Sequence, residues 1–177
     1  SSYQSGWSTG KSNFGVMQYY SNNNVCSTAA CTAAGGVGDV ATNYSNAMGD
    51  INTKMPTPGN GTNVSGDSPK EVLFLVTDGV EDQTASSCSR TMTGTRCQAP
   101  IDTSLCTTIK NRGIQIAVLY TEYLAVPTNS WYLSWISPFQ SSIETNLQAC
   151  ASSSQMYIKA SFGDDLGTAL NKLFQAS

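Results

Sequence analysis

The chain has 177 residues, of which 40% are apolar and only 12% are charged, and its net charge is −3. That length is sufficient for one domain with a buried core. The acidic balance argues against a nucleic-acid partner, because phosphate backbones select basic surfaces. No apolar run approaches the ~20 residues that cross a bilayer, so we expect no membrane span in this chain.

The sequence contains six cysteines and no histidine. The absence of histidine excludes mixed Cys/His zinc sites and Ser-His-Asp catalysis. An even number of cysteines in a polar, weakly charged chain is typical of disulfides in an oxidising compartment; buried thiols in a cytosolic protein are the alternative. Closure of short loops favours two pairs and leaves a third: Cys26–Cys31, Cys88–Cys97 and Cys106–Cys150.

The first part of the chain predicts a strand, a loop and a helix. Residues 14–20 read as a short strand, and residues 21–39 as a polar loop that holds two cysteines. Apolar side chains then recur at helical spacing and end before Pro56 and Pro58: Tyr44, Ala47, Met48, Ile51 and Met55. Residues 56–70 read as a second polar loop.

The stretch from Glu71 to Gly79 is the most uniform apolar run of the chain. Such a run predicts a strand over residues 71–77 that is buried on both faces, in the middle of a parallel sheet. Asp78 follows directly, so we expect its carboxylate at the carboxyl edge of the sheet, where open α/β sheets place their ligands.

The remaining elements alternate helix and strand. A polar loop over 79–100 precedes a helix at 101–109, which Gly113 ends, and a buried strand at 114–120. Ser137-Pro138 indicates the start of a helix that reaches Cys150. A strand at 156–159 and an amphipathic helix at 166–174, capped by Ser161 with Asp164, complete the chain. This order predicts an α/β fold with a mostly parallel sheet.

Two motifs resemble von Willebrand factor A-type domains, which are three-layer, Rossmann-like α/β folds. They are Thr42-Asn-Tyr-Ser-Asn-Ala-Met48 and Thr77-Asp-Gly79. The resemblance implies that Thr42 and Asp78 are ligands of a metal-ion-dependent adhesion site, which would hold Mg²⁺ through hard oxygen atoms. The family's D-x-S-x-S motif is lacking; its nearest match, Asp102-Thr-Ser104-Leu-Cys106, opens a helix.

Three further segments resemble TadG-like proteins of the Flp (tight adherence) pilus assembly. They are Cys88-Ser-Arg-Thr-Met-Thr-Gly-Thr-Arg-Cys97, Leu105 to Thr121, and Asn129-Ser-Trp-Tyr132 with Pro138-Phe-Gln140. The resemblance implies an upstream membrane anchor and a von Willebrand A-like region in the periplasm or at the cell surface. Residues 1–177 would be the distal part of that one domain, with its N-terminal part missing.

The function expected from this resemblance is non-enzymatic protein–protein interaction in assembly or display of the pilus. Partners would be pilus or envelope proteins, or the missing N-terminal segment, and this fragment would bind Mg²⁺ weakly or not at all. One alternative is a secreted adhesin that binds a host or surface ligand directly. A second alternative is a hydrolase that uses Asp78, Glu81 and Asp82. The aromatic cluster near Trp131 would be core or, alternatively, a partner-binding face.

Overall fold

The structure is a computed structural model and describes residues 42–177. Cys26 and Cys31, the strand predicted at 14–20 and the loop at 21–39 lie outside the described residues. The main elements in chain order are α4 (Tyr44–Lys54), β1 (Val72–Thr77), β2 (Val80–Thr84), β3 (Arg96–Pro100), α5 (Thr103–Lys110), β4 (Gln115–Thr121), α6 (Ser130–Trp135), α7 (Gln140–Cys150), β5 (Tyr157–Ala160) and α8 (Leu166–Ala176). Two 3₁₀ turns, Ser137–Phe139 and Ser154–Met156, precede α7 and β5.

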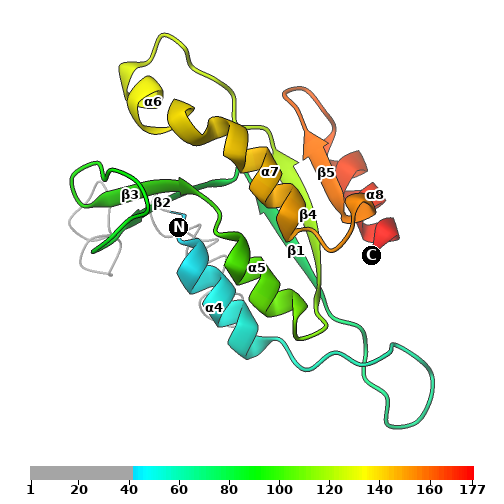
Figure 1. Ribbon diagram of the computed structural model, residues 1–177. Coiled ribbons are helices and arrows are strands. Elements are labelled where there is room, and N and C mark those ends of the chain that lie inside the picture. Colours follow the sequence, from blue (N-terminus) through cyan, green and yellow to red (C-terminus); the bar gives the residue numbers. More distant parts are fainter. Residues whose placement is uncertain (1–41) are drawn as a thin grey trace, which may run out of the picture.

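Strands β1, β4 and β5 form a parallel sheet in the order β1-β4-β5. Helices α4, α5 and α7 cover one face, and α8 lies on the other (Figure 1). The prediction of an α/β fold with a mostly parallel sheet is therefore confirmed, and the alternation of strands with crossover helices is its cause.

The centre of the described sheet is β4. Its residues from Ile116 to Tyr120 are at most 3% exposed, because helices cover both of its faces. The strand over residues 71–77 was predicted to be buried on both faces in the middle of the sheet. Burial on both faces is wrong, because Val76 on the α8 side is 53% exposed. Within the described residues β1 is an outer strand of the sheet. An apolar run indicates a strand but does not fix its place in the sheet.

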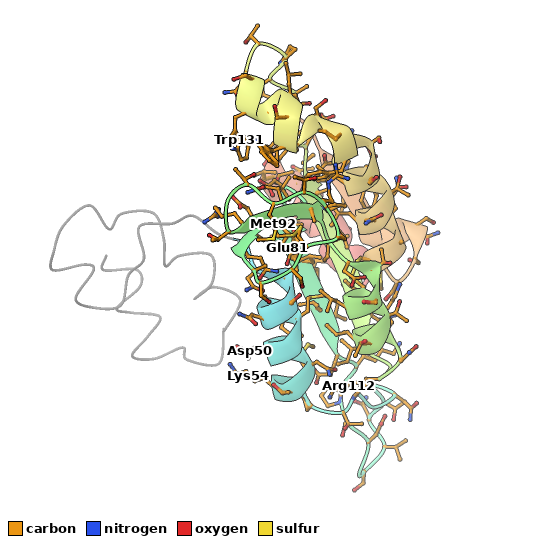
Figure 2. The ribbon with its side chains drawn as sticks, turned by 60° about the vertical axis from the view of Figure 1, so that its left-hand side comes forward. Asp50, Lys54, Glu81, Met92, Arg112 and Trp131 are labelled. Carbon is orange, nitrogen blue, oxygen red and sulfur yellow. A yellow bond between two sulfur atoms is a disulfide. The ribbon has the colours of Figure 1, made fainter. Side chains whose placement is uncertain are left out.

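Helix α5 holds its two neighbours together at one end of the helical layer. The guanidinium of Arg112, just after α5, donates to the carbonyl oxygens of Asn52 and Met55 at the end of α4. Nζ of Lys110 lies 2.6 Å from the carbonyl oxygen of Ala149 near the end of α7. Both cations thus satisfy helix C-terminal carbonyls and oppose the negative end of the helix dipole. Figure 2 shows Arg112 at this end of α4, with Glu81 near its opposite end.

Two of the three predicted disulfides lie in the described residues, and both are confirmed. Cys88 pairs with Cys97 across 9 residues, and Cys106 pairs with Cys150 across 44 residues. The second bond joins α5 to α7 inside the core, where both cysteines are fully buried. In the loop-entropy description the longer loop contributes more stability, about 3–4 kcal/mol.

The region at 79–100 differs from the polar loop that the sequence predicts. Strands β2 and β3 pair there as an antiparallel hairpin. The strand pattern is hidden in the sequence because two of the buried positions, Glu81 and Gln98, are polar and are satisfied by hydrogen bonds. Helix α6 was also missed, because its six residues are too few for a helical stripe to be recognised.

Two helix starts also differ from the predictions. Ser137-Pro138 opens a 3₁₀ turn, and α7 begins only at Gln140. Asp164 does accept the backbone N–H of Ser161 at 2.7 Å, as a capping box requires. However, the residue that caps α8 is Asp165, whose side chain accepts from the Gly167 and Thr168 amides. The sequence indicated a polar cap before α8, but the capping residue is Asp165 rather than Ser161 with Asp164.

Gly79 provides a sharp test of this packing. Its φ is +82°, and a Cβ there would lie 2.3 Å from Cγ2 of Ile143 on α7. We expect Gly79→Ala to destabilise the protein by about 2–5 kcal/mol, from backbone strain plus overpacking. Gly94→Ala is the control, because its φ is +62° but a Cβ would meet nothing within 4 Å. That variant should lose only about 1–2 kcal/mol in denaturant unfolding; equal losses would contradict the close contact with α7.

Candidate functional site

The turn Thr77-Asp78-Gly79 ends β1 at the carboxyl edge of the sheet. Oγ1 of Thr77 accepts the Gly79 amide at 3.0 Å and shares a 2.5 Å hydrogen bond with the hydroxyl of Tyr44 on α4. Oδ1 of Asp78 accepts the amide of Val80 at 3.1 Å. All three turn residues therefore have a structural task.

The structure places Thr42 beside the hairpin. Its carbonyl oxygen accepts the Asp82 amide at 3.0 Å, in an isolated bridge to β2. The residue that caps α4 is Asn43, whose side chain accepts from Asn46. Among the described residues, no hydrogen bond joins the side chains of Thr42 and Asp78. Their assignment as metal ligands stays a prediction.

Two of the three acidic residues considered for hydrolysis are bound within the fold. Glu81 is 8% exposed and accepts the backbone amides of Tyr44 and Ser45 at the start of α4. Burial raises the pKa of its carboxyl group, and the two amides oppose that rise. The carboxylate of Asp82 is held by Arg96 at 2.9 Å and by Nε2 of Gln98 at 2.8 Å. Neither acid stands free as a nucleophile or general acid.

An open pocket lies at the carboxyl ends of β1 and β4. Its volume is about 290 Å³, and it is lined by Asp78, Thr121, Glu122, Tyr123, Leu124 and Val126. This is the place at which parallel α/β sheets bind ligands, because the loops that leave neighbouring strands diverge there. The position predicted for Asp78 at the sheet edge agrees with this geometry. The stretch from Glu122 to Val126 was not singled out in the sequence, since it carries no recognisable motif.

The two carboxylates of the pocket differ in their partners. Glu122 lies 2.8 Å from Nζ of Lys159 and accepts the hydroxyl of Ser161 at 2.7 Å, and these bonds lower its pKa. No cationic side chain pairs with Asp78 among the described residues. The surrounding protein raises the pKa of Asp78, because it partly withdraws the carboxylate from water, although the residue remains exposed.

Tyr123 forms a fixed wall of the pocket. Its amide donates to the hydroxyl of Tyr120 at 3.1 Å, and its carbonyl oxygen accepts from Nε2 of Gln140 at 2.9 Å. Its ring stacks on that of Tyr132, with centroids 6.4 Å apart. The two hydrogen bonds hold the backbone of Tyr123, and its ring packs against Tyr132 before any ligand arrives.

Two exposed apolar side chains, Leu124 and Val126, line the pocket; they are 51% and 45% exposed, and we call them the apolar rim. On α6, Trp131 and Leu133 are 42% and 49% exposed. Tyr132, Ile136 and Phe139 of the same aromatic cluster are buried, so the core interpretation is confirmed for them. Trp131 instead lies on the surface of α6 (Figure 2). Exposed apolar side chains that gather beside a pocket are typical of a protein-binding surface.

Residues 42–177 contain no group of three or more His, Cys, Asp or Glu side chains that could hold a metal ion. Asp78 and a neighbouring hydroxyl would supply too few oxygen atoms for Mg²⁺, which prefers six in an octahedral array. The described residues alone therefore do not fit a resident Mg²⁺.

Comparison with protein-family models, with curated proteins and with solved structures finds no match for this chain. None of the helices in the described part of the chain has both the length and the apolar character needed to cross a membrane. The two disulfides fit an oxidising, extracytoplasmic setting.

The unpaired carboxylate of Asp78 predicts a characteristic pH dependence. Because its pKa is raised in the folded state, its ionisation costs stability as pH rises above the unfolded value. Asp78→Asn keeps an oxygen that accepts the Val80 amide but cannot ionise. We expect the unfolding free energy of the variant, relative to wild type, to increase from about pH 3 to about pH 6.

For Asp67→Asn we expect the opposite change of unfolding free energy with pH, so this variant serves as the contrast. Asp67 accepts the amides of Asn60 and Thr62 at 2.8 Å, and its hydrogen bonds lower its pKa. Its ionised form therefore stabilises the fold, and the loss in the variant should grow as pH rises over the same range. Denaturant unfolding across the pH series measures both variants. Equal slopes of unfolding free energy against pH would contradict the difference in environment between Asp78 and Asp67.

Proposed function

We propose that the chain is a non-enzymatic protein–protein interaction module in the assembly or surface display of a bacterial adhesion pilus. The observation that carries this proposal is the apolar rim beside the pocket at the carboxyl edge of the sheet. Exposed apolar side chains cost free energy in water and gain it when a partner covers them. A surface that combines them with a pocket suits protein binding better than catalysis on a small substrate.

The resemblance to TadG-like proteins supplies the biological setting of the proposal. Its most distinctive segments fall on the disulfide-bonded hairpin, on α5 with β4, and on α6. Two of these segments, which end at Thr121 and begin at Asn129, flank the stretch that lines the pocket. The partners proposed are pilus or envelope proteins, or an upstream segment of the same protein. The location proposed is the periplasm or the cell surface, with membrane anchoring through that upstream segment.

The fold proposed is the distal part of a von Willebrand A-like domain. The three-stranded parallel sheet with helices on both faces is compatible with this fold. Strand β1 has a described neighbour on one side only, which is compatible with a sheet that continues beyond the described strands. A strand from an upstream segment, or from another chain, would pair with this edge.

An enzymatic role has less support from the site. Hydrolysis by two carboxylates needs one as acid and the other as nucleophile or base. Glu81 and Asp82 are committed to the start of α4 and to the hairpin, respectively. The second carboxylate of the pocket, Glu122, is bound by Lys159 and Ser161. We therefore propose binding without turnover.

We propose that Mg²⁺ binds this fragment weakly or not at all, and binds a complete domain better. In the complete domain Thr42 and Asp78 would be two of its oxygen ligands. Calorimetry with Mg²⁺ and Mn²⁺ should show heats near dilution for the 177-residue chain, since two oxygens are too few. A longer protein that includes an upstream segment should give saturable binding that Asp78→Ala reduces. Tight binding by the fragment that survives Asp78→Ala would remove both residues from the metal assignment.

The pilus role is tested by replacing the gene in a bacterium that carries it. The double variant Leu124→Glu with Val126→Glu places charge in the rim, and it should sharply reduce assembled surface pili because a partner can no longer cover these positions. Val64→Glu is the matched control, because Val64 is 70% exposed in the loop between α4 and β1. Both proteins should be present at wild-type level with their disulfides intact.

Shearing of surface pili and attachment to an abiotic surface are the two measurements. Wild-type pili and attachment in the rim variant would overturn the proposal. Wild-type pili with lost attachment would favour the alternative of a direct adhesin.

A further inference from the structure

The pocket at the carboxyl edge combines a carboxylate, an aromatic ring and two aliphatic side chains. We propose that it receives the side chain of an arginine or lysine from the partner protein. This inference rests on the proposed protein-binding function and specifies the chemistry of the partner. The contact group of the partner would be basic, and the residues next to it in sequence would be apolar.

The charge of the pocket favours a cation. Asp78 has no cationic partner among the described residues. Lys159 is shared between Glu122 and Glu144, at 2.8 and 3.0 Å. One ammonium therefore serves two carboxylates, and it leaves Asp78 without a cation. An arriving cation would complete the charge balance that the described residues leave open.

The walls of the pocket suit the shape of a basic side chain. Arginine and lysine have apolar stems and charged heads, and they lay the stem along apolar surface while the head meets a polar group. Leu124 and Val126 are 51% and 45% exposed and offer that apolar surface. Tyr123 lines the pocket, and aromatic rings attract cations. Its ring stacks on that of Tyr132.

Other occupants fit less well. A divalent metal needs more oxygen ligands than these residues provide. An acidic peptide or a nucleic-acid phosphate would meet two carboxylates, Asp78 and Glu122, in the same pocket. A purely apolar side chain could cover the rim, but it would bury the charge of Asp78 without a partner, which is costly.

The test is an NMR titration of the ¹⁵N-labelled 177-residue chain with two acetylated and amidated peptides. Both have the sequence Gly-Leu-X-Leu-Gly, where X is arginine in one and citrulline, its neutral near-isostere, in the other. The arginine peptide should give saturable shifts at the amides from Thr121 to Val126. The citrulline peptide should bind about tenfold more weakly, because the charge-assisted bond is lost.

Variants separate the contact from the overall charge. Asp78→Asn should weaken the arginine peptide about tenfold and bring it to the level of the citrulline peptide. Asp50→Asn makes the same charge change on the outward side of α4 and should leave the affinity unchanged (Figure 2). Tyr123→Phe should retain binding, whereas Tyr123→Leu should weaken it, because only the latter removes the aromatic face.

Equal affinity for both peptides, or no saturable shift with either, would overturn the inference. Equal losses of affinity in the Asp78 and Asp50 variants would also overturn it. So would Mg²⁺ that binds saturably at the same amides and displaces the peptide. The pilus assay distinguishes this failure from failure of the proposed function. If Asp78→Asn leaves both pili and peptide binding intact while the rim variant loses pili, the interaction role stands and the basic-side-chain pocket does not.

Discussion

The contact between Gly79 and α7 is the constraint on which the carboxyl edge of the sheet depends. A Cβ at this position would lie 2.3 Å from Ile143 and 2.9 Å from Leu147, so α7 can pack this closely only on a glycine. The positive φ of the same residue turns the chain sharply out of β1 and into β2. That turn leaves Asp78 at the mouth of the pocket, and it directs β2 toward the start of α4. Packing in the core and geometry at the candidate site thus have one origin.

The hairpin transmits this constraint to the first helix. Successive residues of β2 point to opposite sides, so that Glu81 meets the amides at the start of α4 while Asp82 meets Arg96 and Gln98 across the hairpin. The Cys88–Cys97 bond then closes the hairpin near its tip. A segment that is polar in sequence is therefore as constrained as the core. Its order comes from satisfied polar groups rather than from apolar burial.

The sequence was informative where one face of an element is apolar and the other polar. Helices α4, α5, α7 and α8 were predicted for this reason. Strands β1 and β4 were predicted from apolar runs, and the Cys106–Cys150 pair was what remained after closure of the short loops. The sequence was misleading where polar side chains are buried or apolar ones are exposed: Glu81 and Gln98 are buried, and Val76 is exposed. The position of Asp78 at the pocket was predicted from the sequence, but the other lining residues were not. A strand followed by an acidic residue locates Asp78, whereas Tyr123 and Val126 join it only through the parallel pairing of β1 with β4.

The carboxylates at this edge of the sheet differ in their partners, and this difference is why we place the candidate site at Asp78 alone. Glu81, Asp82 and Glu122 each have donors or a cation that offset the cost of their charge. Asp78 has only the amides of its own turn and is exposed beside the pocket, whereas Glu81, whose pKa is also raised, is buried against the start of α4. A turn needs no charge at this position, because an asparagine accepts the same amide. A ligand can reach this carboxylate and compensate its charge, which is the reason to place recognition at Asp78 rather than at its better-bonded neighbours.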